Sequence, residues 1–201
     1  EVRDTENTSS LDIDKFDLVS SSNPGPGPGP GPGPNTIKIA QVTSYGGSQD
    51  TGGTATIKNN GATLDMDGNA WKKMALAYNI TADTMLEFDF SSSEKGEIHG
   101  IGFDDDTDLT TSRNRIFQLY GTQTWGIQDF DNYNGSGNVT HYKIPVGQFY
   151  TGNQKYLIFV NDNDANHAIG KSVFSNIRLY EDSQGGSNTI TFEQRVNSST
   201  E

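Results

Sequence analysis

Short runs in which apolar and polar residues alternate recur along most of this 201-residue chain. In the run Leu86-Glu87-Phe88-Asp89-Phe90, every second side chain is apolar. Successive side chains of a β-strand point to opposite faces, so this pattern predicts a strand with one face in a core. Strands are predicted at residues 36–43, 54–57, 63–66, 73–78, 85–90, 97–103, 116–120, 125–130, 141–145, 155–160 and 172–180.

Turn-forming residues separate these runs, and no dozen residues carry apolar side chains at helical spacing. Many short strands with Gly, Asn, Asp, Ser and Thr between them are typical of β-sandwiches and jelly rolls. We therefore expect an all-β fold, a β-sandwich (jelly roll) of antiparallel sheets, over residues 36–183. A segment of this length can bury a sizeable core.

A strict alternation of proline and glycine from Pro24 to Pro34 interrupts the β pattern and holds six of the seven prolines. Such a run favours extended geometry and cannot bury a core, so it predicts a spacer between modules; a loop inside one domain is the alternative. We expect residues 1–22 to be the C-terminal strand and tail of a preceding module and 23–35 a Pro-Gly linker. Residues 184–201 are expected to be a linker and the start of a following segment.

The charge balance narrows the choice of partners. A net charge of −12 without a basic stripe disfavours nucleic acid, because phosphate backbones are repelled. No apolar run approaches the length that spans a membrane, so no membrane partner is expected. The absence of cysteine excludes a disulfide scaffold and is compatible with secretion from a bacterium. We expect a secreted, monomeric module within a multidomain chain.

Two loops that follow predicted strands carry oxygen ligands at every second position. They are Asp104, Asp106 and Asp108 in the first loop, and Asp162, Asp164 and Asn166 in the second. Calcium takes six to eight oxygen ligands and relieves the mutual repulsion of such carboxylates. Neither loop has the glycine and glutamate of an EF-hand, and solvated turns are the alternative. We expect calcium as a cofactor, with Asp104, Asp106, Asp162 and Asp164 as its ligands.

Residues 120–137 interleave aromatic rings with amides, carboxylates and glycines. Sugar recognition needs this mixture, because a ring covers the C–H face of a pyranose and polar groups bond its hydroxyls. Trp125 and Tyr133 are the rings expected on a ligand, although a core position for Trp125 is equally compatible with the pattern. The other predicted sugar contacts in this segment are Asp129, Asp131, Asn132 and Tyr120. Phe130 and Trp71 are expected to belong to the core.

The sequence carries no catalytic signature. Glu87 and Asp89 face away from their apolar neighbours on an alternating strand, which favours a solvated surface. The three histidines are scattered, with no metalloprotease spacing and no nucleophile elbow. A glycosidase with two carboxylates on a jelly roll would leave no reliable signal, so catalysis stays open as a lesser alternative. We predict no catalytic residues.

The second half of the chain resembles the closing strands of β-sandwich carbohydrate-binding modules in families 6, 35 and 36. The resemblance rests on a proline-containing strand at 141–145, an apolar strand at 155–160, a loop, and a final strand at 172–180. Residues 11–18 look like the final strand of a family 6 module. Residues 85–104 look like accessory modules of bacterial polysaccharide-degrading enzymes. Unlike family 6 modules, residues 37–41 contain no acidic calcium ligands.

This resemblance implies a non-catalytic module that binds a polysaccharide and targets an attached secreted glycoside hydrolase or lyase to it. It makes Asp164 and Asn166 candidates for ligand contacts, and it implies calcium either beside the sugar or in a structural position. Agar-type galactan, xylan, alginate and other β-glycans all stay open as ligands. A calcium-rigidified adhesin or matrix repeat and a catalytic jelly-roll glycosidase are the alternatives.

Overall fold

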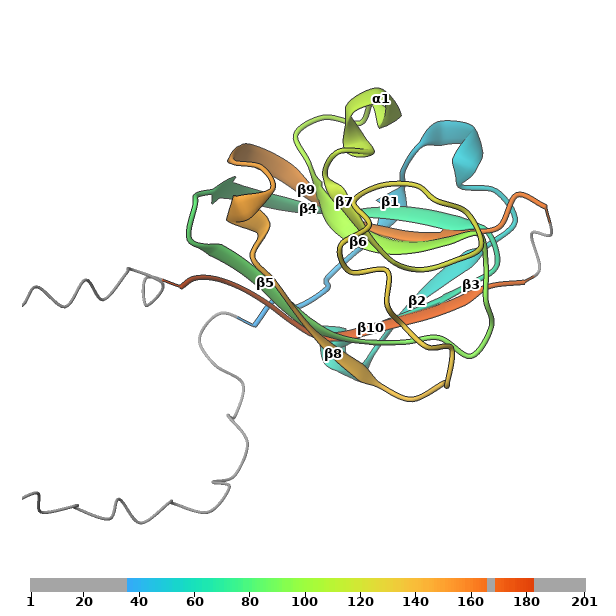
Figure 1. Cartoon of the computed structure of the whole chain (residues 1–201). Coiled ribbons are helices and arrows are strands. Elements are labelled where there is room, and N and C mark those ends of the chain that lie inside the picture. The colour runs from blue at the N-terminus through green and yellow to red at the C-terminus, as the bar shows by residue number, and fades with distance from the viewer. Residues whose placement is uncertain (1–35, 166–168, 183–201) are drawn as a thin grey trace, which may run out of the picture. The chain divides into compact units, whose positions relative to one another are not determined.

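Two antiparallel sheets lie face to face in the computed structural model, which describes residues 36–165 and 169–182 (Figure 1). All described residues belong to one unit. The predicted preceding module, the Pro-Gly linker, the following segment and Asn166 lie outside the described residues. In the described part, no helix is long and apolar enough to cross a membrane.

Each sheet has five strands. Sheet A has the order β2 (Thr54–Lys58), β3 (Thr63–Asp67), β10 (Lys171–Glu181), β5 (Thr84–Ser91) and β8 (Thr140–Ile144). Sheet B has the order β1 (Thr43–Ser44), β4 (Ala70–Ile80), β9 (Gly152–Asp162), β6 (Ile98–Asp104) and β7 (Ile116–Tyr120). The helical turns are η1 (Gly47–Gln49), η2 (Asn59–Gly61), α1 (Leu109–Ser112) and η3 (Val146–Gln148).

The chain crosses repeatedly from one sheet to the other. β3, β5, β8 and β10 lie in sheet A, whereas β4, β6, β7 and β9 lie in sheet B. All strand ladders are antiparallel, and the last strand, β10, pairs with both β3 and β5 in the middle of its sheet. This is jelly-roll connectivity, and it confirms the predicted all-β sandwich.

The main core lies between the sheets and is built by the predicted alternation. In β5, Leu86, Phe88 and Phe90 are fully buried, while the residues between them are half-buried on the outer face. The Phe90 ring lies 5.2 Å from that of Phe174 on β10 and 5.1 Å from that of Tyr133, measured between ring centroids. Burial of large side chains of this kind stabilises the fold by about 1.5–3 kcal/mol each.

The predicted strand at 36–43 is wrong over most of its length. Thr36 bridges to Arg178 of sheet A, whereas the short strand β1 pairs Thr43 with Lys73 of sheet B. Between these points Ile39 donates its backbone N–H to Gly61 at 2.9 Å and buries its side chain. A segment that crosses from one sheet to the other cannot stay paired with the strands of either. Residues 37–42 therefore connect the two sheets without forming a strand, although their apolar and polar residues alternate.

The predicted strand at 125–130 is also wrong. This segment makes a single parallel bridge, Phe117 with Ile127, along the edge of β7. Gly126 has a φ of 79°, a conformation that breaks a strand and that glycine adopts without strain. The other predicted strands are confirmed, with β4 and β9 extending beyond their predicted ends.

Candidate functional site

The outer face of sheet B carries a second apolar cluster, separate from the main core. In β9, Leu157 and Phe159 point into the main core, so Ile158 and Val160 point outward. Trp71 of β4 lies beside Val160 in the ladder and belongs to this outer cluster. Trp71 is buried, with 3 % of its surface exposed, as predicted for a core residue, but the cluster that buries it is the outer one and not the main core.

Two glycines of β6 let the chain approach closely on this face. A Cβ atom added at Gly102 would lie 2.2 Å from the carbonyl oxygen of Arg115, and one at Gly100 would lie 2.9 Å from that of Phe117. Only glycine fits where another backbone comes this near. The backbone of β7 and the residues preceding it therefore lies close against β6, and Ile116 joins the outer cluster.

Residues 45–50 and 105–112 form a roof over this outer cluster. Tyr45 stacks on Trp71 with ring centroids 6.4 Å apart, and its hydroxyl donates to Asp104 Oδ2 at 2.6 Å. Asp50 pins the same loop to β4, because its Oδ1 accepts the Trp71 backbone N–H at 3.0 Å. Leu109, the first residue of α1, packs against the cluster from the other loop.

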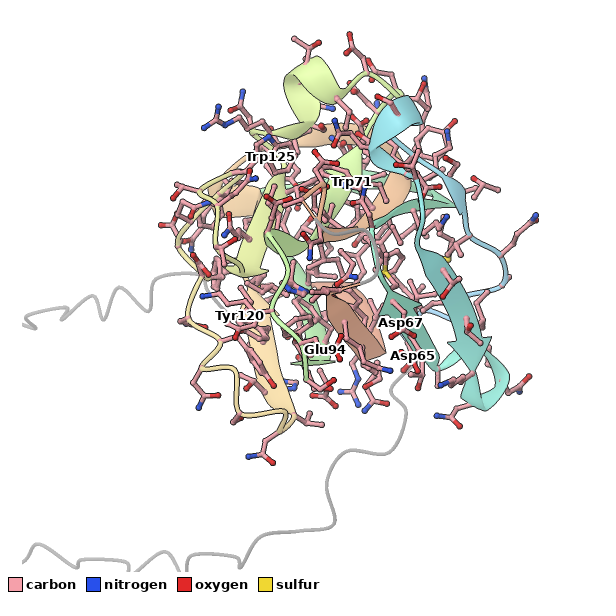
Figure 2. The ribbon with its side chains drawn as sticks, turned by 90° about the vertical axis from the view of Figure 1, so that its right-hand side faces the viewer. Asp65, Asp67, Trp71, Glu94, Tyr120 and Trp125 are labelled. Carbon is pink, nitrogen blue, oxygen red and sulfur yellow. The ribbon has the colours of Figure 1, made fainter. Side chains whose placement is uncertain are left out.

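A pocket of about 250 Å³ opens where the roof ends; we call it the two-indole pocket. It is lined by Gln49, Trp71, Ile98, Leu109, Gln123, Trp125, Asp162 and Asp164. Figure 2 shows Trp71 and Trp125 together in the upper part of the molecule, apart from Tyr120. The lining combines aromatic surface with two amides and two carboxylates, contributed by segments that are distant in the sequence.

The two indoles meet at a right angle and are held by hydrogen bonds. Their ring centroids are 5.2 Å apart and their planes make an angle of 82°. Trp71 donates its indole N–H to Asp162 Oδ1 at 2.6 Å. The Trp125 backbone donates to the buried Gln118 Oε1 at 2.8 Å and accepts from Gln128 Nε2 at 2.6 Å. Contacts within the protein thus fix the positions of both indoles.

Three carboxylates gather at one side of the pocket. Glu97, Asp162 and Asp164 each place an oxygen within 4.8 Å of the others. Glu97 Oε2 accepts the backbone N–H groups of Asp164 at 2.6 Å and Ala165 at 3.2 Å, and its Oε1 accepts from Gln123 Nε2 at 2.7 Å. These donors orient Glu97 without neutralising its charge, so a cation fits the chemistry of this group.

The first predicted calcium loop, which begins at Asp104, forms a separate group. Asp104, Asp105 and Asp106 also converge within 4.8 Å, but Arg115 pairs with Asp104 at 3.3 Å and with Asp105. Burial raises the pKa of Asp104, which also accepts the Tyr45 hydroxyl. Because Arg115 already supplies a positive charge, a calcium ion fits this group less well than the group at Glu97.

The two loops cannot hold one ion together. In the ladder of β6 with β9, Ile98 pairs with Asp162 and Asp104 pairs with Tyr156. Six residue steps along a strand separate Asp104 from the Asp162 end, which is a distance of about 20 Å. The predicted set of Asp104, Asp106, Asp162 and Asp164 therefore divides into two groups of carboxylates at opposite ends of β6.

Of the aromatic predictions, Trp125 reaches the pocket and Tyr133 does not. Tyr133 is 5 % exposed in the main core, and its hydroxyl donates to the Asn138 carbonyl at 2.8 Å. Its placement on a ligand is wrong, because the Phe90 and Tyr120 rings enclose it. Tyr120 is half-buried against the core, with the Lys95 ammonium 4.8 Å from its ring centroid.

The predicted polar partners of the aromatic segment lie outside the pocket lining. Asp129, Asp131 and Asn132 are exposed. Asn132 accepts the Tyr142 hydroxyl at 3.0 Å, and Asp131 lies 3.4 Å from the amide nitrogen of Gln118. Phe130 packs against the main core, as predicted.

Sequence patterns missed Gln49, Gln123, Leu109 and Glu97 as parts of the site. Gln49 and Leu109 belong to short helical turns, and Gln123 to a loop, whose spacing carries no signal of a shared surface. Glu97 did lie at the start of a predicted strand. The ladder of β6 with β9 brings it beside Asp162, as shown by its backbone N–H donating to the Asp162 carbonyl at 2.7 Å.

No protein-family model and no curated protein matches the chain. A solved family 30 carbohydrate-binding module of a cellulosomal cellulase of Clostridium thermocellum is 20 % identical, covering 67 % of this chain and 81 % of that chain, with a TM-score of 0.35. Another family 30 module is 17 % identical over 73 % and 95 % of the two chains, with a TM-score of 0.37. A family 11 module of a cellulosomal cellulase of the same organism is 14 % identical over 70 % and 82 %, with a TM-score of 0.33.

These three structures come from families 30 and 11, not from families 6, 35 or 36, whose closing strands the sequence resembles. At such identities and TM-scores, the likeness assigns neither a family nor a ligand to this chain.

Proposed function

We propose that this chain is a non-catalytic carbohydrate-binding module and that the two-indole pocket is its sugar site. The observation that supports this is the combination of Trp71 and Trp125 with amides and carboxylates around one opening. An indole presents a large apolar face to the C–H groups of a pyranose. Amide and carboxylate oxygens accept hydrogen bonds from its hydroxyls.

Each lining group has a role in this proposal. The half-buried Trp125 stacks on the sugar, while Trp71 forms the floor and is held by Asp162. Gln49 and Gln123 donate and accept at the rim, and the exposed Asp164 accepts from a hydroxyl. The buried positions of Trp71 and Asp162 limit their freedom, so little conformational entropy is lost when a ligand binds.

We also propose that calcium assists binding, through the group of Glu97, Asp162 and Asp164. Two of these residues line the pocket, so an ion held by them would lie at its edge. It would hold Asp164 beside Glu97 and Asp162 and reduce the repulsion among the three carboxylates. Asp106 and Asp104 are not part of this proposed site, because their group lies at the other end of β6.

The parent protein is proposed to be a secreted enzyme, and the module to bring it to its polymer. Agar-type galactan, xylan, alginate and other β-glycans are the candidate ligands. Alginate requires the calcium ion in this proposal, because a polyanion is repelled by the pocket carboxylates.

Affinity electrophoresis of residues 36–183 through gels containing each of these polysaccharides tests the proposal, with calcium in one arm and EDTA in the other. We expect one polymer to retard the module. Trp125→Ala should abolish that retardation, since loss of a stacked ring costs about 2 kcal/mol, or about thirtyfold in affinity.

Tyr180→Ala is the matched control, because Tyr180 is a half-buried ring on the outer face of sheet A. Its retardation should equal that of the unmodified module. If the Trp125→Ala variant were retarded as strongly as the unmodified module, the two-indole pocket would not be the sugar site. A module that no polymer retards would point instead to a structural repeat.

A further inference from the structure

We infer that the two-indole pocket takes one terminal sugar residue of a glycan chain and does not hold an internal stretch of polymer. The inference rests on the proposed function and adds how the ligand is presented. Three independent features of the described residues support it: the angle between the indoles, the roof over sheet B, and the arrangement of the polar rim.

The angle between the indoles prevents a flat binding strip. Rings that bind successive sugars of a flat, ribbon-like chain present their faces in one plane, and rings that bind a helical chain are turned but stand apart from each other. The two indoles are in direct edge-to-face contact, so they do not offer two separate platforms. The planes of Trp71 and Trp125 instead cross at 82°, with centroids 5.2 Å apart, so the two rings form a corner. A sugar that stacks on the face of Trp125 would touch Trp71 with its own edge. The corner between the two indoles is therefore a site for one sugar ring.

The roof closes the path along sheet B. Tyr45 is 1 % exposed and lies across the outer face, with its hydroxyl on Asp104. The two roof loops touch, because a Cβ atom added at Gly46 would lie 3.0 Å from Leu109 Cδ1. A chain entering at the indoles therefore has no open groove ahead of it.

A second hollow on the same sheet is separate from the pocket. It is lined by residues that include Thr43, Lys73, Ala75 and Tyr156, and it shares no lining residue with the two-indole pocket. Ala75 lies four residues beyond Trp71 on β4, which is about 14 Å. Ile37, Met74 and Leu76, which belong to the main core or pack against it, also line the second hollow, so it lies at the edge of β4 and does not continue the pocket along the outer face.

Polar groups surround the opening from different sides. Gln49 comes from η1, Gln123 from the loop after β7, and Asp164 from the loop after β9. Such a rim can bond hydroxyls around the whole circumference of one sugar. The volume of about 250 Å³ lies just below the roughly 300–1,000 Å³ of ordinary ligand pockets.

Chain length is the variable that tests the inference. Oligosaccharides of one to six units are cut from whichever polymer of the panel (agar-type galactan, xylan, alginate or a β-1,4-glucan) retards the module, and are titrated calorimetrically with calcium present. We expect the affinity to reach its full value by the disaccharide. A further gain of about tenfold or more between disaccharide and hexasaccharide, about 1.4 kcal/mol, would overturn the inference and leave the proposed function intact.

Competition at equal mass gives a second readout. When the polymer is cut into chains about ten times shorter, the number of ends per gram rises about tenfold. A site for chain ends should then need about one tenth of the mass for half-maximal competition, because occupancy follows the molar concentration of ends. Equal competition per gram would show that internal segments bind.

Tyr156→Ala is the matched control variant. Under the inference it leaves the hexasaccharide affinity unchanged, whereas Trp125→Ala lowers it at every chain length. A loss with Tyr156→Ala that appears only for long oligosaccharides would show that the chain runs along sheet B, against the inference. If no polymer of the panel is bound, the proposed function fails and the inference with it.

Discussion

The two outer faces of the sandwich differ in how they meet water. On sheet A, polar side chains of adjacent strands bond to carboxylates. His141 Nδ1 of β8 lies 2.7 Å from Asp89 Oδ1 of β5, and Glu87 accepts the Tyr180 hydroxyl at 2.9 Å. On sheet B, the corresponding positions hold apolar residues such as Ile158 and Val160 together with two glycines.

A cluster of acidic residues on sheet A shows the same contrast. Figure 2 shows Asp65 and Asp67 of β3, and Glu94 of the loop after β5, in its lower part. Lys171 pairs with Asp67 at 3.1 Å, and Lys58 pairs with Asp65. Hydrogen bonding to Asp67, with the charges of Asp67 and Asp65, raises the pKa of Lys171. Asp65 and Asp67 on this face are compensated by lysines, whereas Glu97, beside the pocket, is held by neutral donors.

The difference explains where a binding site can form. A polar outer face needs no covering segment, because water can hydrogen-bond its side chains. An apolar outer face must be covered by other parts of the chain, and here the covering loops leave Trp71 and Trp125 at an opening. The pocket is the part of the outer cluster that the roof does not fill.

The largest expected effect on the free energy of unfolding comes from adding a side chain at a glycine of β6. Gly102→Ala places a Cβ atom against the Arg115 carbonyl and should lower the free energy of unfolding by about 3 kcal/mol. Gly137→Ala is the control, since a Cβ there meets nothing within 4 Å and only its φ of 76° is unfavourable, costing about 1 kcal/mol. Urea titration of both variants measures the difference; equal losses would contradict the close approach of β7.

Acid should destabilise the fold through His99, which joins the two sheets across the core. Its Nε2 accepts the Gly96 N–H at 2.7 Å, and its Nδ1 lies 2.7 Å from the Ser172 hydroxyl of β10. Burial lowers the pKa of His99 from 6.5 to about 4, and the nearby Lys95 charge acts in the same direction. The unfolded chain therefore binds the proton first as the pH falls.

Between pH 6.5 and 4, stability should fall by about 3 kcal/mol from this residue, and the loss should level off below pH 4. Urea titrations across this range in EDTA measure it. His99→Gln has no proton to bind, so its stability should change less over the same interval. An unchanged pH slope in that variant would show that other groups cause the acid sensitivity.

Removal of calcium tests which of the two carboxylate groups, the one at Glu97 or the one at Asp104, binds the ion. A bound ion stabilises the folded state by about 2.7 kcal/mol when free calcium is a hundred times its Kd. EDTA should therefore lower the melting temperature of the unmodified chain. Asp164→Asn should weaken this response, whereas Asp106→Asn should preserve it; the opposite result would place the ion beside Arg115.

The smallest expected effect is on the outer face of sheet A. Glu87→Gln removes the charge that faces Arg178 at 3.7 Å and His141 at 3.4 Å. Half-exposed ion pairs contribute little, so the loss in stability should be less than about 1 kcal/mol and polysaccharide binding should not change. Reduced retardation in affinity electrophoresis would mean that the charged face, and not the two-indole pocket, binds the polymer.

Local alternation was enough to predict most strands and the sandwich itself. In β5 the period of two in Leu86, Phe88 and Phe90 reports which face is buried, because burial follows from the strand geometry alone. The same reasoning failed at 36–43 and 125–130. There the residues have strand-like composition, but one segment crosses between sheets and the other follows the edge of β7.

By itself, therefore, the sequence determined the fold class and placed Trp125, Asp162 and Asp164 among the candidate residues. Only the tertiary structure decided that Tyr133 belongs to the core, that Trp71 lines the pocket, and that Asp104 and Asp162 lie at opposite ends of β6. The physical reason is that periodicity records burial within one strand. The register between strands, and the loops that cover an outer face, depend on contacts between residues far apart in the chain.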